Sequence, residues 1–479
     1  MSPPPRPVLG LALSLLAGGA AAAGAGEAAA LPARRTLATV VVVSARAPVV
    51  SEGRAVAAVR RGRMFGVLAR EGERVSVQVC EGAAPRRGWL EARHVRPVTD
   101  GEVDLAWEAL KIARELDPQV DLMASWARLE ALATRVAAAA AGGRTARERA
   151  RRIAAQLYGR ERFTYAHGVK RLDQVLATRR GDCVGLCLLY LRVARELRMP
   201  LYLVTWPSHV LVRHDDGTDR FHIETTERGA VRNIDDPVQH RRGRVAGGIH
   251  CLALPAPRAL GVLTHVWGTL LAERGKAAEA CARFATACEI NPRDVEALTL
   301  WGAALHKRGR YAEACDRYQR VVAIDPGHSE VRLRWGMALN QMGRYAEACG
   351  KCAEAVKLAP DYADGWHAWG FALARLGRHG EACERFAKAV ALRPDFAAAH
   401  AAWGASLGRI GKLAEANASH AKAVELEPLN ARAHLAWAMT LAQAGRRAEA
   451  LERLDRAALL DPALKPKADK LRHTLRPPR

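Results

Sequence analysis

The C-terminal half of the chain repeats itself every 34 residues. Tryptophan recurs at this interval from Trp267 to Trp437, glycine from Gly275 to Gly445, alanine from Ala280 to Ala450 and proline from Pro292 to Pro462. A fixed period of this length, held in four columns without a slip, is the signature of a stacked repeat architecture. Residues 261–464 are therefore predicted to form six units that bury a continuous core between neighbours.

The chemistry of these columns predicts a pair of helices in each unit. Glycine accepts the left-handed conformation that ends the first helix, and proline ends the second helix. The alanine column allows the two helices to pack closely. The six tryptophans are predicted to lie in the core rather than to form a ligand site. Residues 465–479 are expected to form a charged capping helix and a tail.

This all-α superhelix resembles the tetratricopeptide repeat family. One unit shows the family pattern at Trp335-Gly336, Gly343, Tyr345, Ala348 and Pro360. Tryptophan fills a position where the family usually has leucine, and the family's own tryptophan position varies here. The resemblance implies a scaffold whose concave groove binds a protein or a peptide.

The first helix of each repeat lines the groove in that family, so its inward positions supply candidate binding residues. One inward position of the repeat holds the cations Lys307, Arg375 and Arg409 in three of the repeats. Arg432 lies nearby at another inward position. Guanidinium groups bind carboxylates in bidentate pairs, so an extended acidic peptide is the expected ligand. The alternative is that the cations are neutralised by acidic residues at another inward position: Glu296, Glu330 and Asp364.

The N-terminus has the pattern of an export signal. A positive residue, Arg6, precedes the apolar stretch from Val8 to Ala23, and Ala23-Gly24-Ala25 resembles a cleavage site. Residues 1–25 are therefore predicted to be a signal peptide that sends the protein to the periplasm or the extracellular space of a bacterium. An uncleaved anchor or a wrong start codon is the alternative. No later segment has 18 uninterrupted apolar residues, so no membrane span is expected after cleavage.

The chain is basic. It has 479 residues, and 73 Lys and Arg against 50 Asp and Glu give a formal charge of +23. This balance favours acidic partners, with cell-wall material as one candidate, although arginine spread through the whole chain is also explained by composition alone. No nucleic-acid-binding motif is found, so no nucleic-acid partner is expected. No cofactor is expected either.

Ten cysteines in an exported protein would usually indicate disulfides. Four of them instead form a column of the repeat: Cys281, Cys315, Cys349 and Cys383. Neighbouring repeats stack about one helix diameter apart, which exceeds the usual Cα separation in a disulfide. These cysteines are predicted to be small buried hydrophobic residues.

Residues 36–98 show a rhythm of short strands. β-Branched runs alternate with glycines, and RVSVQV alternates with period two. The segment ends in Gly88-Trp89-Leu90 and His94-Val95. It resembles a bacterial Src-homology-3-like domain, a small β barrel. Arg74, Val75 and Val77 stand where that family has an aromatic residue, so a structural role is as well supported as ligand binding.

Residues 104–255 contain the candidate chemistry. Cys183 lies at the first turn of a buried helix that extends to Leu197, where the helix dipole favours a thiolate. A strand and a hairpin centred on Asp216-Gly217 follow. With that turn central, His209 faces Glu224 directly. Arg213 then faces Arg220, which counts against the register.

This α+β region resembles the papain-like and transglutaminase-like superfamily of cysteine proteases. The motifs are Gly181-Asp182-Cys183, the helix from Leu188 to Leu197, and the segment from Pro207 to Arg213. The family's Cys-His-Asp triad carries over to Cys183, His209 and, with a change of acid, Glu224. The resemblance implies a cysteine peptidase, an amidase or an acyl transferase.

Two functions therefore remain open for this multidomain chain. Either the triad hydrolyses or transfers an acyl group, or the domain only binds and the protein is an interaction and assembly scaffold. A zinc site at Cys183, Cys187, His209 and His222 is a weaker alternative, because the spacing fits no usual zinc pattern.

Overall fold

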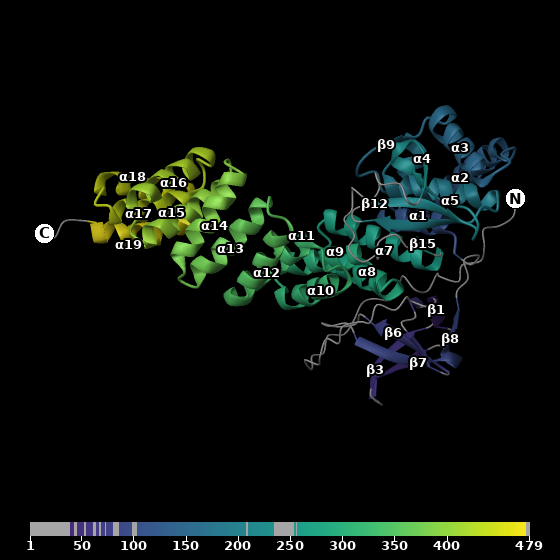
Figure 1. Cartoon of the computed structure of the whole chain (residues 1–479), viewed down its shortest axis with the longest axis horizontal. Helices are drawn as coiled ribbons and strands as arrows, with labels where there is room; N and C mark the ends of the chain where they lie inside the picture. The colour runs from purple at the N-terminus through teal and green to yellow at the C-terminus, as the bar shows by residue number, and fades with distance from the viewer. Residues whose placement is uncertain are drawn as a thin grey trace. The chain divides into compact units, whose positions relative to one another are not determined.

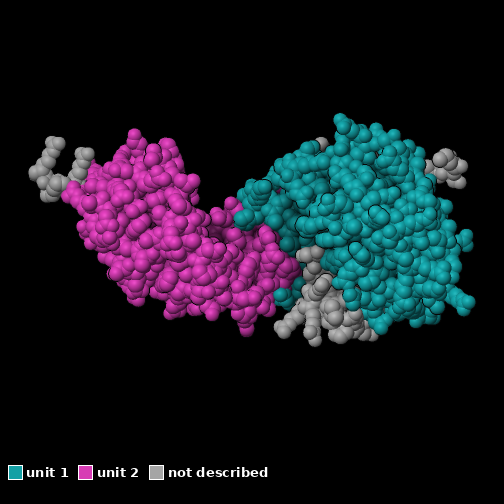
Figure 2. Space-filling model, turned by 90° about the horizontal axis from the view of Figure 1, so that it is seen from above, with its two compact units in different colours: residues 1–309, 323–327 teal, residues 310–322, 328–479 magenta. Residues whose placement is uncertain are grey.

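The computed structural model describes residues 39–42, 46–51, 54–60, 64–66, 69–71, 73–79, 86–97, 103–206, 209–233, 253–254 and 256–475. The predicted signal peptide lies outside these residues. The chain divides into two compact units, one of residues 1–309 and 323–327 and the other of residues 310–322 and 328–479 (Figure 2). Within the described part, no helix is long and apolar enough to cross a membrane.

The N-terminal part of the first unit is made of short antiparallel strands. One sheet has the order β4-β1-β8 and the other the order β3-β2-β7-β6-β5. The strands are β1 (Thr39–Val42), β2 (Arg46–Ser51), β3 (Arg54–Arg60), β4 (Met64–Gly66), β5 (Ala69–Glu71), β6 (Arg74–Val79), β7 (Arg86–Glu91) and β8 (Val95–Pro97), with a short 3-10 helix, η1 (Ala92–His94), before β8. Val49, Phe65, Val77 and Leu90 are among its buried core residues. Between residues 39 and 97 the described strands show no closed barrel, so the Src-homology-3-like barrel stays a prediction.

The α/β region of the first unit packs helices on a five-stranded antiparallel sheet (Figure 1). Its helices are α1 (Leu105–Leu116), α2 (Leu122–Ala140), α3 (Ala146–Ala154), the π-helix η3 (Ala155–Arg160), α4 (Leu172–Thr178) and α5 (Cys183–Glu196). The sheet has the order β14-β13-β12-β11-β15, from β11 (Leu201–Trp206), β12 (His209–Asp215), β13 (Arg220–Glu224), β14 (Ala230–Asn233) and β15 (Ala253–Leu254). Helix α5 packs on β11 and β12, so the buried helix predicted from Cys183 lies against the sheet.

Side-chain caps explain where these helices begin. Asp104 accepts from the backbone N–H of Ala106 at 3.0 Å, and Asp121 accepts from Ala124 at 2.9 Å. Such caps satisfy backbone donors that the first turn of a helix leaves unpaired. The two helices are separated around Asp117-Pro118, as the sequence predicts.

The first repeat helices belong to the same unit as the α/β region. They are α7 (Ala256–Glu273), α8 (Ala277–Ile290) and α9 (Val295–Lys307), and α7 packs on α1. Lys170 pairs with Glu273 at 2.8 Å, and Arg274 donates to the backbone oxygen of Leu116 at 2.5 Å. The repeat sequence therefore begins inside the compact unit that carries the candidate chemistry.

The remaining repeat helices alternate as the period predicts. They are α10 (Tyr311–Ile324), α11 (Ser329–Gln341), α12 (Tyr345–Leu358), α13 (Ala363–Arg375), α14 (His379–Leu392), α15 (Ala397–Arg409), α16 (Leu413–Leu426), α17 (Ala431–Gln443) and α18 (Arg447–Leu460), followed by η5 (Pro462–Leu464) and α19 (Lys465–Leu475). The six glycines of the turn column have φ between +72° and +80°, the left-handed conformation expected of them. The six alanines of the repeat column are fully buried.

The tryptophan column is only partly in the core. Trp267 and Trp301 are buried, whereas the other four are half-buried. Cations 16 residues further on stack over these rings: Arg283 on Trp267, Lys351 on Trp335, Arg385 on Trp369 and Arg453 on Trp437, at 3.4 to 4.6 Å from the ring centroids. Part of the chain's positive charge therefore covers tryptophan rings within the array.

The cysteine column contains no disulfide among the described residues. All eight described cysteines are free. Cys281 and Cys315 are buried, as predicted, whereas Cys349 and Cys383 are half-buried.

Candidate functional site

Cys183 is the first residue of α5, and its surroundings hold that helix end in place. The carboxylate of Asp182 accepts from the backbone N–H of Gly185 at 3.1 Å and caps the helix. The backbone N–H of Asp182 donates to the oxygen of Val169 at 3.0 Å, and the strands β9 (Thr164–Tyr165) and β10 (Arg180–Gly181) pair in parallel just before it. Cys183 is partly exposed.

His209 and Glu224 lie on the neighbouring strands β12 and β13, but not in the predicted register. The prediction placed them directly opposite each other, whereas the observed pairs include Val212 with Ile223 and Arg213 with His222. The register is therefore shifted by two residues. Because side chains alternate with period two, an even shift leaves both residues on the same face. His209 and Glu224 are then diagonal neighbours, which is still within reach of long side chains.

The hairpin loop explains the corrected register. It comprises residues 216–219 instead of a two-residue turn, and one oxygen of Asp216 accepts from the backbone N–H of Thr218 at 2.9 Å and of Asp219 at 2.7 Å. Arg220 now pairs with Asp215 at 3.0 Å, so the predicted contact between two arginines does not arise.

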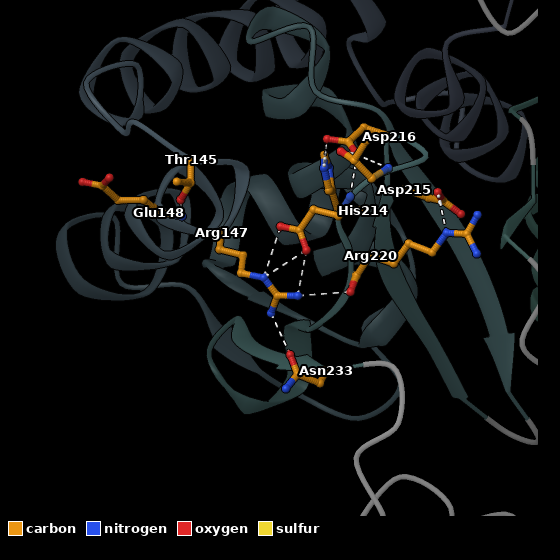
Figure 3. Close-up of polar contacts among 10 residues, drawn as sticks. Thr145, Arg147, Glu148, His214, Asp215, Asp216, Arg220 and Asn233 are labelled. Atoms are coloured by element: carbon orange, nitrogen blue, oxygen red, sulfur yellow. Dashed lines mark hydrogen bonds and ion pairs between the residues drawn. The ribbon is translucent and has the colours of Figure 1, made fainter.

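Arg147 of α3 fastens the hairpin to the rest of the domain (Figure 3). Its guanidinium donates to the carboxylate of Asp219 at 2.8 to 3.1 Å and to the side-chain oxygen of Asn233 at 2.8 Å. It also lies 4.8 Å from the centroid of the Phe221 ring. These contacts tie the loop end of β12 and β13, the strands that carry His209 and Glu224, to α3.

The imidazole of His209 contacts the carboxylate of Glu224. Its Nε2 atom lies 2.9 and 3.0 Å from the two carboxylate oxygens. Glu224 is 7% exposed, and His209 is 29% exposed. Because Nε2–H donates to the carboxylate, Nδ1 is the ring nitrogen left for the Cys183 side chain, which also hydrogen-bonds to His209. The structure thus brings together all three residues of the predicted triad.

The charges of this cluster favour ionised side chains. Burial lowers the pKa of His209, but hydrogen bonds with Cys183 and Glu224 outweigh burial and raise the pKa to about 10. Burial raises the pKa of Glu224, but its hydrogen bonds with His209 and Thr226 outweigh burial, and the net shift is downward. At neutral pH the pair is therefore an imidazolium beside a carboxylate.

Two residues at this site were not found from the sequence. Thr226, in the 3-10 helix η4 (Thr225–Glu227), donates its hydroxyl to Glu224 at 2.6 Å. Tyr165 is 47% exposed, and partial burial, with a smaller effect of the nearby Cys183, raises the pKa of its hydroxyl. No periodicity identifies either residue. The only sequence signal for Thr226 is a hydroxyl residue two positions after a carboxylate at the end of a strand.

The predicted groove cations are all exposed. Arg375 lies over the ring of Tyr345 at 4.7 Å. Two of the three acidic residues that were considered as their partners pair with other arginines, Glu330 with Arg334 at 2.6 Å and Asp364 with Arg393 at 2.7 Å. Within the described residues, Lys307, Arg409 and Arg432 form no ion pair.

The zinc alternative finds no support in the geometry. Cys187 is buried, with its sulfur 3.4 Å from the hydroxyl of Thr225, and His222 accepts from Arg213 at 3.0 Å. No group of three or more metal-binding side chains occurs in the part of the chain that the structure describes.

Comparisons with known proteins agree with two of the resemblances. A family model of the transglutaminase-like superfamily matches residues 124–248, and a tetratricopeptide repeat model matches residues 296–328. No curated protein matches the chain.

Similar solved structures are repeat proteins. YrrB, described as a TPR protein with an unusual peptide-binding site, is 25% identical, covers 39% of this chain and 97% of its own, and has a TM-score of 0.34. MamA from Desulfovibrio magneticus RS-1 is 25% identical and has a TM-score of 0.34, and the match covers 36% of this chain and 96% of MamA. PilF from Pseudomonas aeruginosa is 20% identical and has a TM-score of 0.38, and the match covers 43% of this chain and 94% of PilF. The two family models show that the chain carries a transglutaminase-like domain and tetratricopeptide repeats.

Proposed function

We propose that this protein is an exported scaffold whose transglutaminase-like domain hydrolyses or transfers an acyl group through Cys183, His209 and Glu224. The observation that carries the proposal is the contact of 2.9 Å between His209 Nε2 and the buried carboxylate of Glu224, beside Cys183 at the start of α5. A nucleophile, a base and a group that orients the base are the three parts that thiol catalysis needs.

The reaction follows from the ionised pair. The Cys183 thiolate attacks the carbonyl carbon of a peptide or amide, and the carbonyl π electrons move to oxygen. When the tetrahedral intermediate collapses, the C–N bond breaks and the His209 imidazolium gives its proton to the leaving amine. A thioester remains. Water or a second amine then attacks it while the neutral His209 accepts a proton, and the thiolate leaves.

Glu224 orients the imidazole of His209 in this reaction. It stays ionised and holds Nε2–H, so Nδ1 faces the sulfur through both half-reactions. Glutamate is one methylene longer than the aspartate of the family, and the diagonal position on β13 gives the longer side chain room to reach His209.

Amine incorporation tests the catalytic proposal. The mature protein is incubated with casein as acyl donor and a fluorescent primary amine, and Cys183→Ala is the matched control. We expect fluorescent casein, or shortened or deamidated casein by mass spectrometry if water is the acceptor, and neither product with Cys183→Ala. If the two proteins give identical products, the site is not catalytic, and the domain acts only in binding and assembly.

We further propose that the repeats bind an extended acidic peptide in their groove. Arg409 and Arg432 are exposed cations with no ion pair among the described residues, and Arg375 is exposed over Tyr345. Met337, Phe371 and Met439 are large apolar residues that remain exposed on the first helices of their repeats. An acidic peptide with apolar anchors fits this chemistry, because carboxylates pair with the cations and the anchors cover the apolar side chains.

Charge reversal tests the groove. The double variant Arg375→Glu with Arg409→Glu is used in pull-downs from an envelope extract. The control, Lys357→Glu with Lys388→Glu, makes the same change in net charge at exposed residues of second helices. We expect the groove variant to lose acidic partners and the control to retain them. Equal recovery with both variants would show that the groove charge does not select the partner.

Export and the N-terminal module complete the proposal. Residues 1–25 act as the signal peptide, and the Src-homology-3-like strands of residues 36–98 give the mature protein a structural module or a contact with cell-wall material. The exported location agrees with a scaffold that acts in the bacterial envelope.

A further inference from the structure

Thr226 makes two hydrogen bonds to one oxygen of Glu224. Its hydroxyl donates to Oε1 at 2.6 Å, and its backbone N–H donates to the same atom at 3.2 Å. The other oxygen, Oε2, is the one that lies nearest to His209 Nε2, at 2.9 Å. Thr226 therefore holds Oε1 from two donors, while His209 Nε2 contacts both oxygens, at 3.0 Å for Oε1 and 2.9 Å for Oε2.

The backbone around Thr226 is itself fixed. The hydroxyl of Tyr158 donates to the oxygen of Thr225 at 2.7 Å, and the N–H of Gly229 donates to the oxygen of Glu224 at 3.0 Å. Arg228 adopts the left-handed conformation, with φ of 54°, where the chain turns back into β14. A side chain anchored to this short helix has little freedom to change its position.

The hydrogen bonds from Thr226 restrict the conformational freedom of the Glu224 side chain. Glutamate has one more rotatable side-chain bond, and a mobile carboxylate would hold an imidazole in several orientations. Two donors on Oε1 select a single orientation and also favour the ionised form. Glu224 thus has a partner that restricts its carboxylate to one orientation.

We propose that Thr226 is a positioning residue for the Cys183–His209 pair, acting through Glu224. It touches neither sulfur nor imidazole, and its effect reaches the thiolate because a fixed carboxylate keeps Nε2–H directed at itself and Nδ1 directed at the sulfur. This inference rests on the proposed function of the site.

The test is the pH profile of Cys183 alkylation by iodoacetamide between pH 5 and 9. Thr226→Val removes the hydroxyl and keeps the shape, and Thr226→Ser restores the donor. Because a hydrogen bond to a charged group is lost, we expect Thr226→Val to lower the alkylation rate at pH 6 by roughly three- to tenfold. Thr226→Ser should remain within about twofold of the wild type, and all three rates should converge near pH 9, where an ordinary thiol ionises unaided.

A matched control stands on the same hairpin. The hydroxyl of Thr218 donates to the carboxylate of Asp216 at 2.7 Å, in the loop that joins β12 and β13. Thr218→Val loses the same kind of bond away from the site, and its profile should follow that of the wild type. If Thr226→Val does not fold, Thr226→Ala removes the same donor without a branched side chain.

The outcomes separate this inference from the function on which it rests. If Cys183 of the wild type is alkylated no faster than the other cysteines, the proposed function fails and the inference fails with it. If the wild type is selective but Thr226→Val and Thr226→Ala keep its profile, only the positioning role is overturned. A lower rate at pH 6 that serine restores supports it.

Discussion

Iodoacetamide at pH 6 should alkylate Cys183 far faster than any other described cysteine. Cys183 is partly exposed at the start of α5 and contacts His209, and this is the surrounding in which thiols react fast, so a difference of roughly 100-fold is expected. Burial raises the pKa of Cys315 to about 11 and that of Cys352 to about 12. The measurement is mass spectrometry of peptides after timed alkylation of the native protein.

His209→Ala is the decisive companion to this measurement. Without the imidazolium, the rate at Cys183 should fall to that of an ordinary exposed thiol. Alkylation in urea should abolish the difference among cysteines, because the contact with His209 is then absent. Comparable rates at Cys183, Cys349 and Cys383 in the native protein would rule out an activated nucleophile.

The sequence predicted the elements of the site better than their pairing. The start of α5 at Cys183 follows from a capping aspartate and an apolar helix, and both features are local. The hairpin register depends on the loop, where the Asp216 side chain accepts from two backbone donors and makes the connection longer than a two-residue turn. His209 and Glu224 still meet because a shift of two residues preserves the face of each strand.

The repeats show the same division between local and tertiary information. The positive φ of each turn glycine follows from a rule that concerns one residue at a time. The exposure of a tryptophan depends on what packs over it. Lys351 stacks on Trp335, and Arg385 stacks on Trp369, each from the second helix of the same repeat. The recurrence of tryptophan every 34 residues does not predict these contacts.

The buried pair of His265 and Asp294 should be the most costly single contact to break in the first repeats. His265 Nδ1 lies 2.9 Å from the carboxylate of Asp294, and both side chains are buried. Another oxygen of Asp294 accepts from the backbone N–H of Ala297 at 2.9 Å and caps α9. Burial lowers the pKa of His265, but the charge of Asp294 outweighs burial and raises it. Burial likewise raises the pKa of Asp294, but His265 outweighs burial and lowers it.

Asp294→Ala removes the charge and the helix cap together, and we expect it to destabilise this region by about 3–5 kcal/mol. Asp294→Asn keeps a cap and should cost less. The histidine contribution is complete below its unfolded pKa of about 6.5 and declines as the pH rises through the raised folded value, while the aspartate contribution is lost as the pH falls below about 3.8. The difference between the wild type and Asp294→Asn should therefore be larger at pH 5.5 than at pH 9.

Hydrogen exchange of peptides from α7 and α9 measures the local opening free energy directly. Equal protection of the wild type and Asp294→Ala at pH 5.5 would show that the pair contributes nothing to stability. A difference between the wild type and Asp294→Ala that is the same at pH 5.5 and pH 9 would assign the effect to the cap alone.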